Sequence, residues 1–220
     1  MSFYESLIAR SSGERQQMLD IPLIQRALRG DVSLVEYQAF LGQAYHHVKH
    51  TVPLLMACGA RLPGHLDWLR AALAHYIAEE IGHEEWILDD LAASGGDPDA
   101  VRRSSPAPAT EVMVAYAYDQ IQRRNPVGFL GMVYVLEGTS VSLAHHAAGA
   151  IGSSLDLPPA AFHYLQSHGS VDQEHIRFLE DLLNRLDNTQ DQASVLHAAA
   201  MFFRLYGDIF RTLTSSGINA

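Results

Sequence analysis

The chain has 220 residues, 48% of them hydrophobic, so it is long enough and apolar enough to bury one sizeable core. Its formal net charge of −10 argues against a nucleic-acid partner and against an anionic membrane surface. Cys58 is the single cysteine, which excludes an internal disulfide and a multi-cysteine zinc site. We expect one domain that spans residues 1–220.

The amino-terminal segment lacks the basic start and the long apolar run of a signal peptide. The most apolar stretch, residues 127–151, contains Glu137, His145 and His146. These polar residues indicate a buried helix and argue against a membrane span. We therefore expect a soluble, cytoplasmic protein with no membrane partner.

Helix-capping and helix-breaking residues divide the chain into helical segments, and no Asn-Gly hairpin or run of alternating β-branched residues is found. The predicted helices span, in chain order, residues 12–29, 34–58, 66–93, 110–124, 126–151, 159–167, 168–186 and 191–214, with Ser194 as the alternative start of the last. Ser33 and Glu36 form a capping box, Pro53 bends the second helix, and residues 97–109 indicate a surface connection. We expect an all-α bundle of seven or eight helices.

His168, Asp172 and His175 form the pattern HxxxDxxH within one predicted helix. Side chains at i, i+4 and i+7 fall within an arc of roughly 60°, because 3.6 residues make one helical turn. Two imidazoles and a carboxylate on one face are good ligands for a first-row transition metal. The alternative is an exposed helix face that carries an Asp–His pair.

A second carboxylate–histidine pair lies on the third predicted helix. Glu80 and His83 are at i and i+3, so they share a helix face. Helical bundles that hold two metals use this carboxylate-x-x-His unit. Glu79 is the alternative carboxylate, and a solvated acidic face would also fit the segment, since Glu84 and Glu85 follow.

Glu137 is the only acidic residue between residues 120 and 155. A carboxylate on an otherwise apolar helix needs a compensating partner, because burial of its charge costs several kcal/mol. A metal ion would be such a partner, and a tyrosine hydroxyl or an arginine would be another.

These motifs together resemble the haem-oxygenase-like di-iron oxidases and oxygenases. That superfamily shares its fold with haem oxygenase, with thiaminase-II-like (TenA-like) proteins and with the last oxidase of pyrroloquinoline quinone biosynthesis (PqqC-like). The resemblance covers nearly the whole chain. The segments that carry it are Val35-Glu-Tyr-Gln-Ala-Phe-Leu, Tyr45-His-His-Val-Lys-His, Glu79-Glu80-x-x-His83, Leu136-Glu137-Gly and His168-x-x-x-Asp172-x-x-His175.

The resemblance implies a helical bundle that binds two iron ions, with manganese as a possible substitute. It implies an enzyme that activates O2 to oxidise a small fatty-acid-, amino-acid- or amine-like substrate. An external electron donor and a homodimer are also expected. One metal would be held by Glu80, His83 and His168, and the other by Glu137, Asp172 and His175.

Five further side chains are candidates for lining the pocket beside the metals: His46, His47, His50, Tyr76 and Tyr134. Tyr76 stands where some family members carry the first carboxylate. An early-helix histidine is the axial ligand of haem oxygenase, so a haem-binding protein is one alternative function. A cofactor-free TenA-like or PqqC-like enzyme or binding protein is another, and a non-enzymatic helical interaction module is a third.

Overall fold

A computed structural model gives the fold, and it describes residues 1–139 and 143–213, with the side chains of residues 167–175 left out. The described chain contains helices and no strand, so the all-α prediction is confirmed. The α-helices are α1 (Phe3–Leu19), α2 (Pro22–Leu28), α3 (Leu34–Val48), α4 (Thr51–Arg61), α5 (Asp67–Glu80), α6 (His83–Ala93), α7 (Pro98–Arg103), α8 (Pro108–Arg123), α9 (Leu130–Thr139), α10 (His145–Leu155), α11 (His163–Asn184) and α12 (Thr189–Leu213). Short 3-10 helices cover Gly64–Leu66 (η1), Pro126–Phe129 (η2) and Pro159–Phe162 (η4).

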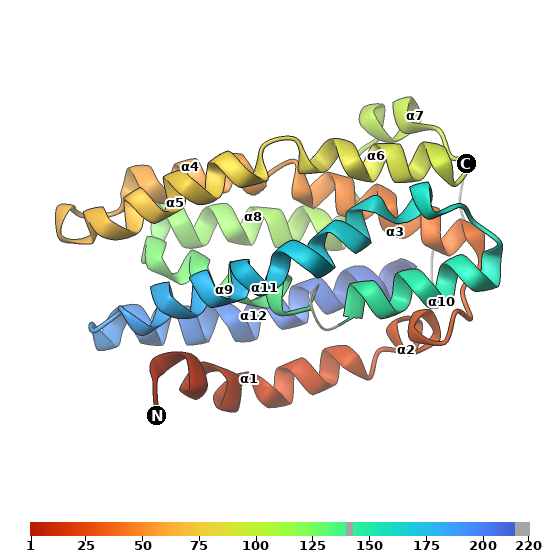
Figure 1. The fold of residues 1–220 in the computed structure, drawn as a ribbon. Helices are drawn as coiled ribbons and strands as arrows, with labels where there is room; N and C mark the ends of the chain where they lie inside the picture. Colours follow the sequence, from red (N-terminus) through yellow and green to blue (C-terminus); the bar gives the residue numbers. More distant parts are fainter. Residues whose placement is uncertain (140–142, 214–220) are drawn as a thin grey trace.

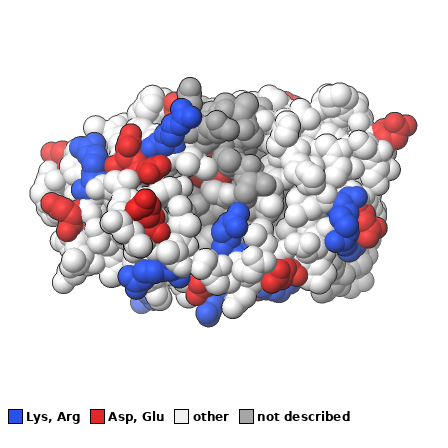
Figure 2. Space-filling view, turned by 60° about the horizontal axis from the view of Figure 1, so that its bottom comes forward, with Lys and Arg blue, Asp and Glu red and all other residues white. Residues whose placement is uncertain are grey.

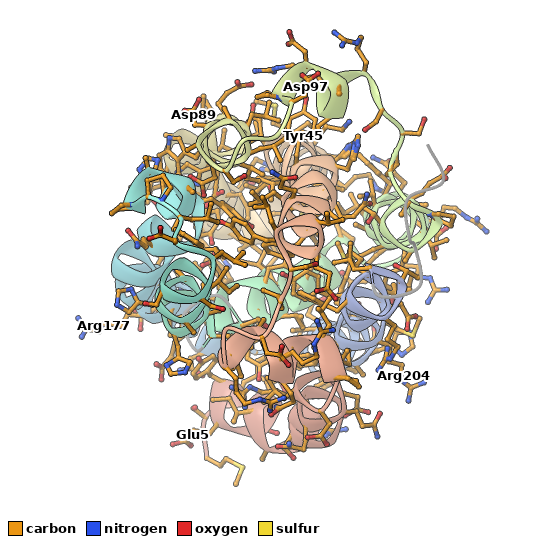
Figure 3. The ribbon with its side chains drawn as sticks, turned by 90° about the vertical axis from the view of Figure 1, so that its right-hand side faces the viewer. Glu5, Tyr45, Asp89, Asp97, Arg177 and Arg204 are labelled. Atoms are coloured by element: carbon orange, nitrogen blue, oxygen red, sulfur yellow. The ribbon has the colours of Figure 1, made fainter. Side chains whose placement is uncertain are left out.

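The long helices run roughly side by side as an elongated bundle (Figure 1). Helix α12 packs against α9, α1 and α8, while α11 packs against α6, α9 and α10. Viewed along the bundle, the charged side chains of Glu5, Asp89, Arg177 and Arg204 project outward around a filled interior (Figure 3). The described helices include none that is long and apolar enough to cross a membrane.

The described residues form more helices than the predicted seven or eight, because helix breaks were missed. The first predicted helix is two helices, and α1 begins early because Ser2 and Glu5 form a capping box. The predicted capping box of Ser33 and Glu36 does start α3. That helix ends before His50, and Pro53 lies in the first turn of α4, where its missing N–H leaves no hydrogen bond unmade.

Two other differences concern proline and glycine. Residues 98–103 form α7, although the proline-rich composition predicted a surface connection there. Pro98 occupies the first turn of α7, and the Asp97 carboxylate accepts a hydrogen bond from the Ala100 N–H. The predicted helix over residues 66–93 is divided at Ile81–Gly82, where Gly82 has a φ of 93°. Glycine adopts this left-handed conformation without the steric cost that a side chain would bring.

Helix α9 lies unusually close to α12 at Gly131. A Cβ added at Gly131 would lie 2.7 Å from both the Val195 carbonyl oxygen and the Ala199 nitrogen. Both are backbone atoms of α12, which cannot rotate away as a side chain can. The absence of a side chain at Gly131 therefore allows α9, the helix that carries Glu137, to lie this close to α12.

Asp90 of α6 anchors the start of α11. Its carboxylate accepts hydrogen bonds from the backbone N–H groups of His163 at 2.8 Å and Tyr164 at 2.9 Å. The side chain is fully buried, and burial raises the pKa of Asp90 to about 6. This contact fixes the beginning of α11 against the helix that carries His83.

Candidate metal centre

The candidate site surrounds a partly enclosed cavity, here called the site cavity, lined by residues of α3, α4, α5, α9, α11 and α12 together with Phe129. It encloses about 600 Å³ of empty space, part of which is open to solvent. Glu80 of α5 and Glu137 of α9 both line it, although they are far apart in the sequence. Both side chains are buried. The fold thus brings together two of the carboxylates that the sequence analysis selected.

Glu80 and His83 remain in contact across the break between α5 and α6. The Nδ1 atom of His83 lies 3.1 Å from Oε2 of Glu80, and both side chains are buried. The His83 ring packs on Trp86 with 4.0 Å between ring centroids. The predicted i,i+3 contact therefore exists, although a left-handed glycine and not a continuous helix produces it.

Glu79 occupies a different environment from its neighbour Glu80. It is exposed, and its Oε1 atom lies 3.4 Å from Nε2 of the exposed His75. The structure thus directs Glu80 to the cavity and Glu79 towards solvent.

Glu137 is buried on α9 and accepts a hydrogen bond at Oε1 from the hydroxyl of Tyr76. Tyr76 lies on α5, one turn before Glu80, and its ring stacks on Phe178 of α11 at 6.3 Å. The tyrosine hydroxyl that the sequence offered as an alternative partner for Glu137 is therefore present. Since the hydroxyl engages one oxygen, it orients the carboxylate.

The five expected pocket-lining residues separate into two groups. His47 and Tyr76 line the site cavity. Tyr134 contacts Ser11, with 3.1 Å between the two hydroxyl oxygens, and His50 Nδ1 lies 3.1 Å from the hydroxyl of Tyr118. Neither of them is among the described residues that line the cavity, and neither is His46.

His46 faces Lys49 and Ser104. Its Nε2 lies 2.9 Å from the Ser104 hydroxyl, and its Nδ1 lies 3.1 Å from the Lys49 ammonium. An ammonium group can only donate, so Nδ1 accepts and Nε2 carries the proton. Burial, followed by the nearby charge of Lys49, lowers the pKa of His46 to about 4. This histidine is therefore neutral at neutral pH.

The pattern HxxxDxxH lies on α11, which is one continuous helix from His163 to Asn184. The side chains of His168, Asp172 and His175 are outside the described residues. The α11 backbone packs against both α6 and α9, which carry His83 and Glu137. Among the side chains that the structure describes, no group of three or more potential ligands is close enough to hold a metal.

The described donors nevertheless suit iron. Two buried carboxylates and one buried imidazole provide the mixed oxygen and nitrogen ligation that iron and manganese accept. The Cys58 thiol offers no alternative, since it lies in α4 with its Sγ 3.3 Å from the Pro126 carbonyl oxygen. Burial raises the pKa of Cys58 to about 12, which disfavours the reactive thiolate.

A family model described as an iron-containing redox enzyme matches residues 38–207. The chain belongs to this family of iron-containing redox enzymes. The matched range includes Glu80, His83, Glu137 and the HxxxDxxH segment. The comparison with curated proteins gave no match.

Solved structures place the family member in the haem-oxygenase-like fold, as the resemblance predicted. A domain of unknown function with that fold from Shewanella denitrificans is 28% identical, with a TM-score of 0.87 over 98% of this chain and 96% of the other. A TenA homologue from Pseudomonas syringae is 13% identical, with a TM-score of 0.80 over 97% and 93%. Haem oxygenase-1 from Synechocystis, in complex with haem, is 12% identical, with a TM-score of 0.77 over 98% and 93%.

Sequence reasoning missed two residues that shape this site. Asp90 follows His83 by seven residues and thus lies on the same buried face of α6, a periodicity that could have identified it. Tyr206 lines the site cavity from α12, and its ring lies 5.8 Å from that of His47. Its place depends on long-range packing, for which the sequence of α12 gave no signal.

Proposed function

We propose that this protein is a non-haem di-iron oxidase or oxygenase that uses O2 to oxidise a small organic substrate. The observation that supports this most strongly is that the buried side chains of Glu80 and Glu137, from separate helices, line one cavity. Burial of two carboxylates is costly, and cations bound between them would offset that cost. The family to which the chain belongs is consistent with iron as the metal.

The proposed ligands form two sets of three. Glu80, His83 and His168 would hold one iron, and Glu137, Asp172 and His175 would hold the other. Helix α11 is the element that would complete both sets, because its backbone packs beside α6 and α9. Manganese has similar ligand preferences and would occupy the same positions.

Iron in this site would supply the redox chemistry with O2, and the protein would control access and orientation. Apolar side chains such as Val48, Leu55 and Met132 line the cavity and would limit bulk water. The Tyr76 hydroxyl donates to one oxygen of Glu137 and so orients the carboxylate that would bind a metal. His47 borders the same cavity, so its imidazole would face the substrate. Reducing equivalents would come from an external donor or from the substrate.

A paired substitution tests the proposal. Glu80→Gln keeps the size of the side chain and removes its charge, and Glu79→Gln makes the same change at the exposed neighbour. We expect wild type and Glu79→Gln to bind Fe(II) anaerobically and to consume O2 when air is admitted. Glu80→Gln should bind iron at least ~10-fold more weakly and lose O2 uptake, since a ligand is removed. Equal iron binding and O2 uptake in the two variants would contradict the proposal, as would activity that chelators leave unchanged.

Haem binding is a second candidate because His47 lines the site cavity. A haem-binding protein would show a Soret band on haem titration that is lost in His47→Ala and kept in His46→Ala, since His46 faces Ser104 and Lys49. The di-iron proposal expects no such His47-dependent band. The same titration therefore separates the two functions.

A further inference from the structure

A second pocket, here called the α2–α10 pocket, lies between α2, α3, α10 and α12. Its walls are mostly apolar and include Leu23, Ile24, Phe40, Ala147, Ile151 and Phe210. It encloses about 850 Å³ of empty space, part of which is open to solvent. Its lining positions on and before α10 run from Leu143 to Ile151, which corresponds to a length of ~12 Å at the helical rise.

The α2–α10 pocket adjoins the site cavity. Tyr164 and Tyr206 line both of them. The Tyr206 ring meets His47 of the site cavity at 5.8 Å and Phe210 of the α2–α10 pocket at 5.0 Å. Thr139, which lines the α2–α10 pocket, follows Glu137 by two residues on α9. The two shared tyrosines therefore place the α2–α10 pocket beside the cavity that Glu80 and Glu137 line.

Three of the polar side chains on the pocket wall are engaged with other protein groups. Glu36 is the charged residue among the described lining residues, and the Arg26 guanidinium donates to both of its oxygens, at 3.0 and 2.8 Å. The Tyr37 hydroxyl donates to the Ala161 carbonyl, and Thr139 donates to a carbonyl one turn earlier. The wall thus offers little to a charged or strongly polar ligand.

On the α10 side of this pocket, the outer surface is also poor in charge. Helix α10 contains no Asp, Glu, Lys or Arg. Figure 2 shows that charged side chains on this face gather on its left half, while the right half, on the side where α10 lies in Figure 1, carries few. An apolar ligand would approach the pocket from this side without covering charged side chains.

We propose that the α2–α10 pocket binds the aliphatic tail of the substrate and presents the substrate's polar head to the site cavity. This inference rests on the proposed di-iron function only for the reaction of the head group. The tail site rests on the apolar walls and on the shared tyrosines.

This assignment selects among the substrate classes that the proposed function leaves open. A charged group on the part of the substrate that occupies this pocket would be buried without a counter-charge, at a cost of several kcal/mol. The described walls of the α2–α10 pocket provide no such partner, because Glu36 is held by Arg26. A chain of methylene groups, in contrast, is stabilised by burial against the same apolar walls. The pocket therefore favours an aliphatic substrate.

Binding of neutral straight-chain alcohols to metal-free protein tests the tail site by itself. Calorimetric titration with the series from 1-butanol to 1-decanol should show affinity that rises about fourfold per added methylene, which corresponds to ~0.8 kcal/mol. Ala147→Phe places a ring in the pocket and should weaken decanol binding at least ~10-fold. Ala27→Leu is a smaller change on α2 and should weaken decanol binding less. This second variant tests the site if Ala147→Phe does not fold.

Ala71→Phe is the matched control, because Ala71 is an exposed position of α5 away from the pocket. It should bind the alcohols as wild type does. Affinity that is independent of chain length would overturn the inference, as would decanol binding that Ala147→Phe and Ala27→Leu both leave unchanged. If sedimentation shows that a second copy of the chain covers the pocket and no alcohol binds, the inference is also wrong. Because no metal is present, failure of iron binding would sink the proposed function and leave this result standing.

Discussion

At the scale of single residues, the contact between Tyr76 and Glu137 is the most informative part of the site. A hydroxyl that donates to one carboxylate oxygen fixes the orientation of the other, and such partners of metal ligands tune metal affinity. Tyr76 lies on α5, one turn before Glu80. We interpret it as an orienting residue for Glu137, which makes a direct test possible.

Tyr76→Phe should weaken Mn(II) or Fe(II) binding by ~10–100-fold, the range found when partners of metal ligands are removed. Tyr134→Phe is the matched control, since Tyr134 is also buried but its hydroxyl contacts Ser11. Equilibrium dialysis of both variants with Mn(II) checks the prediction. Metal affinity that falls equally in both would show a general effect of tyrosine loss on the fold.

His46 should make the protein less stable in mild acid. Its pKa in the folded state is about 4, below the ordinary value of 6.5, so only the unfolded chain takes up this proton between those values. Its contribution to stability is complete above pH 6.5 and is lost as the pH falls through 4. We expect a loss of about 2 kcal/mol, since one pKa unit is about 1.4 kcal/mol and solvent screening reduces the full value.

Denaturant titrations of wild type and His46→Gln between pH 7 and 4 measure this contribution. The variant should lose less unfolding free energy over that range, because glutamine does not titrate. The exposed His65 provides a control, and His65→Gln should behave as wild type. Identical pH dependence in His46→Gln and wild type would contradict the role given to this histidine.

Single residues also show how far the site could be predicted from the sequence. Glu80 and His83 were paired from their spacing, and they are in contact. The preference for Glu80 over Glu79 agrees with their burial, yet its structural cause is the turn at Gly82, which spacing alone does not reveal. Asp90 was overlooked because an acidic residue beside another, Asp89, looks like part of a solvated face.

At the scale of elements, α11 depends on α6 for its position. The Asp90 carboxylate accepts from the first backbone N–H groups of α11, which have no partner within their own helix. Helix α11 carries the HxxxDxxH pattern and α6 carries His83. One buried carboxylate therefore links the two helices that the proposed metal site requires.

Asp90→Asn should lower the free energy of unfolding by roughly 1–3 kcal/mol, because an amide cannot accept both hydrogen bonds. Iron affinity should fall as well, since the start of α11 would shift. Asp89→Asn alters the exposed neighbour and should change neither quantity. Chemical denaturation and iron titration of the two variants check this, and unchanged stability in Asp90→Asn would refute the anchoring role.

At the scale of the whole molecule, the all-α class could be predicted from the sequence, but the arrangement of the helices could not. Capping boxes, glycine stops and the absence of strand signals predicted an all-α chain. The number of helices was underestimated because Pro98 and Pro53 can start a helix as well as break one. The approach of α9 to α12 at Gly131 and the shared walls of the two pockets arise from long-range packing, which one sequence does not encode in any local pattern.

The most direct test of the di-iron proposal is anomalous diffraction from crystals grown anaerobically with Fe(II). We expect two anomalous peaks a few Å apart, bounded by Glu80, His83 and Glu137 and by the side of α11 that carries the HxxxDxxH pattern. Crystals of Glu80→Gln should lose at least the peak beside His83, and crystals of Glu79→Gln should keep both. Iron-loaded crystals with no peak at this cavity, or with iron only at another place such as His46, would contradict the account.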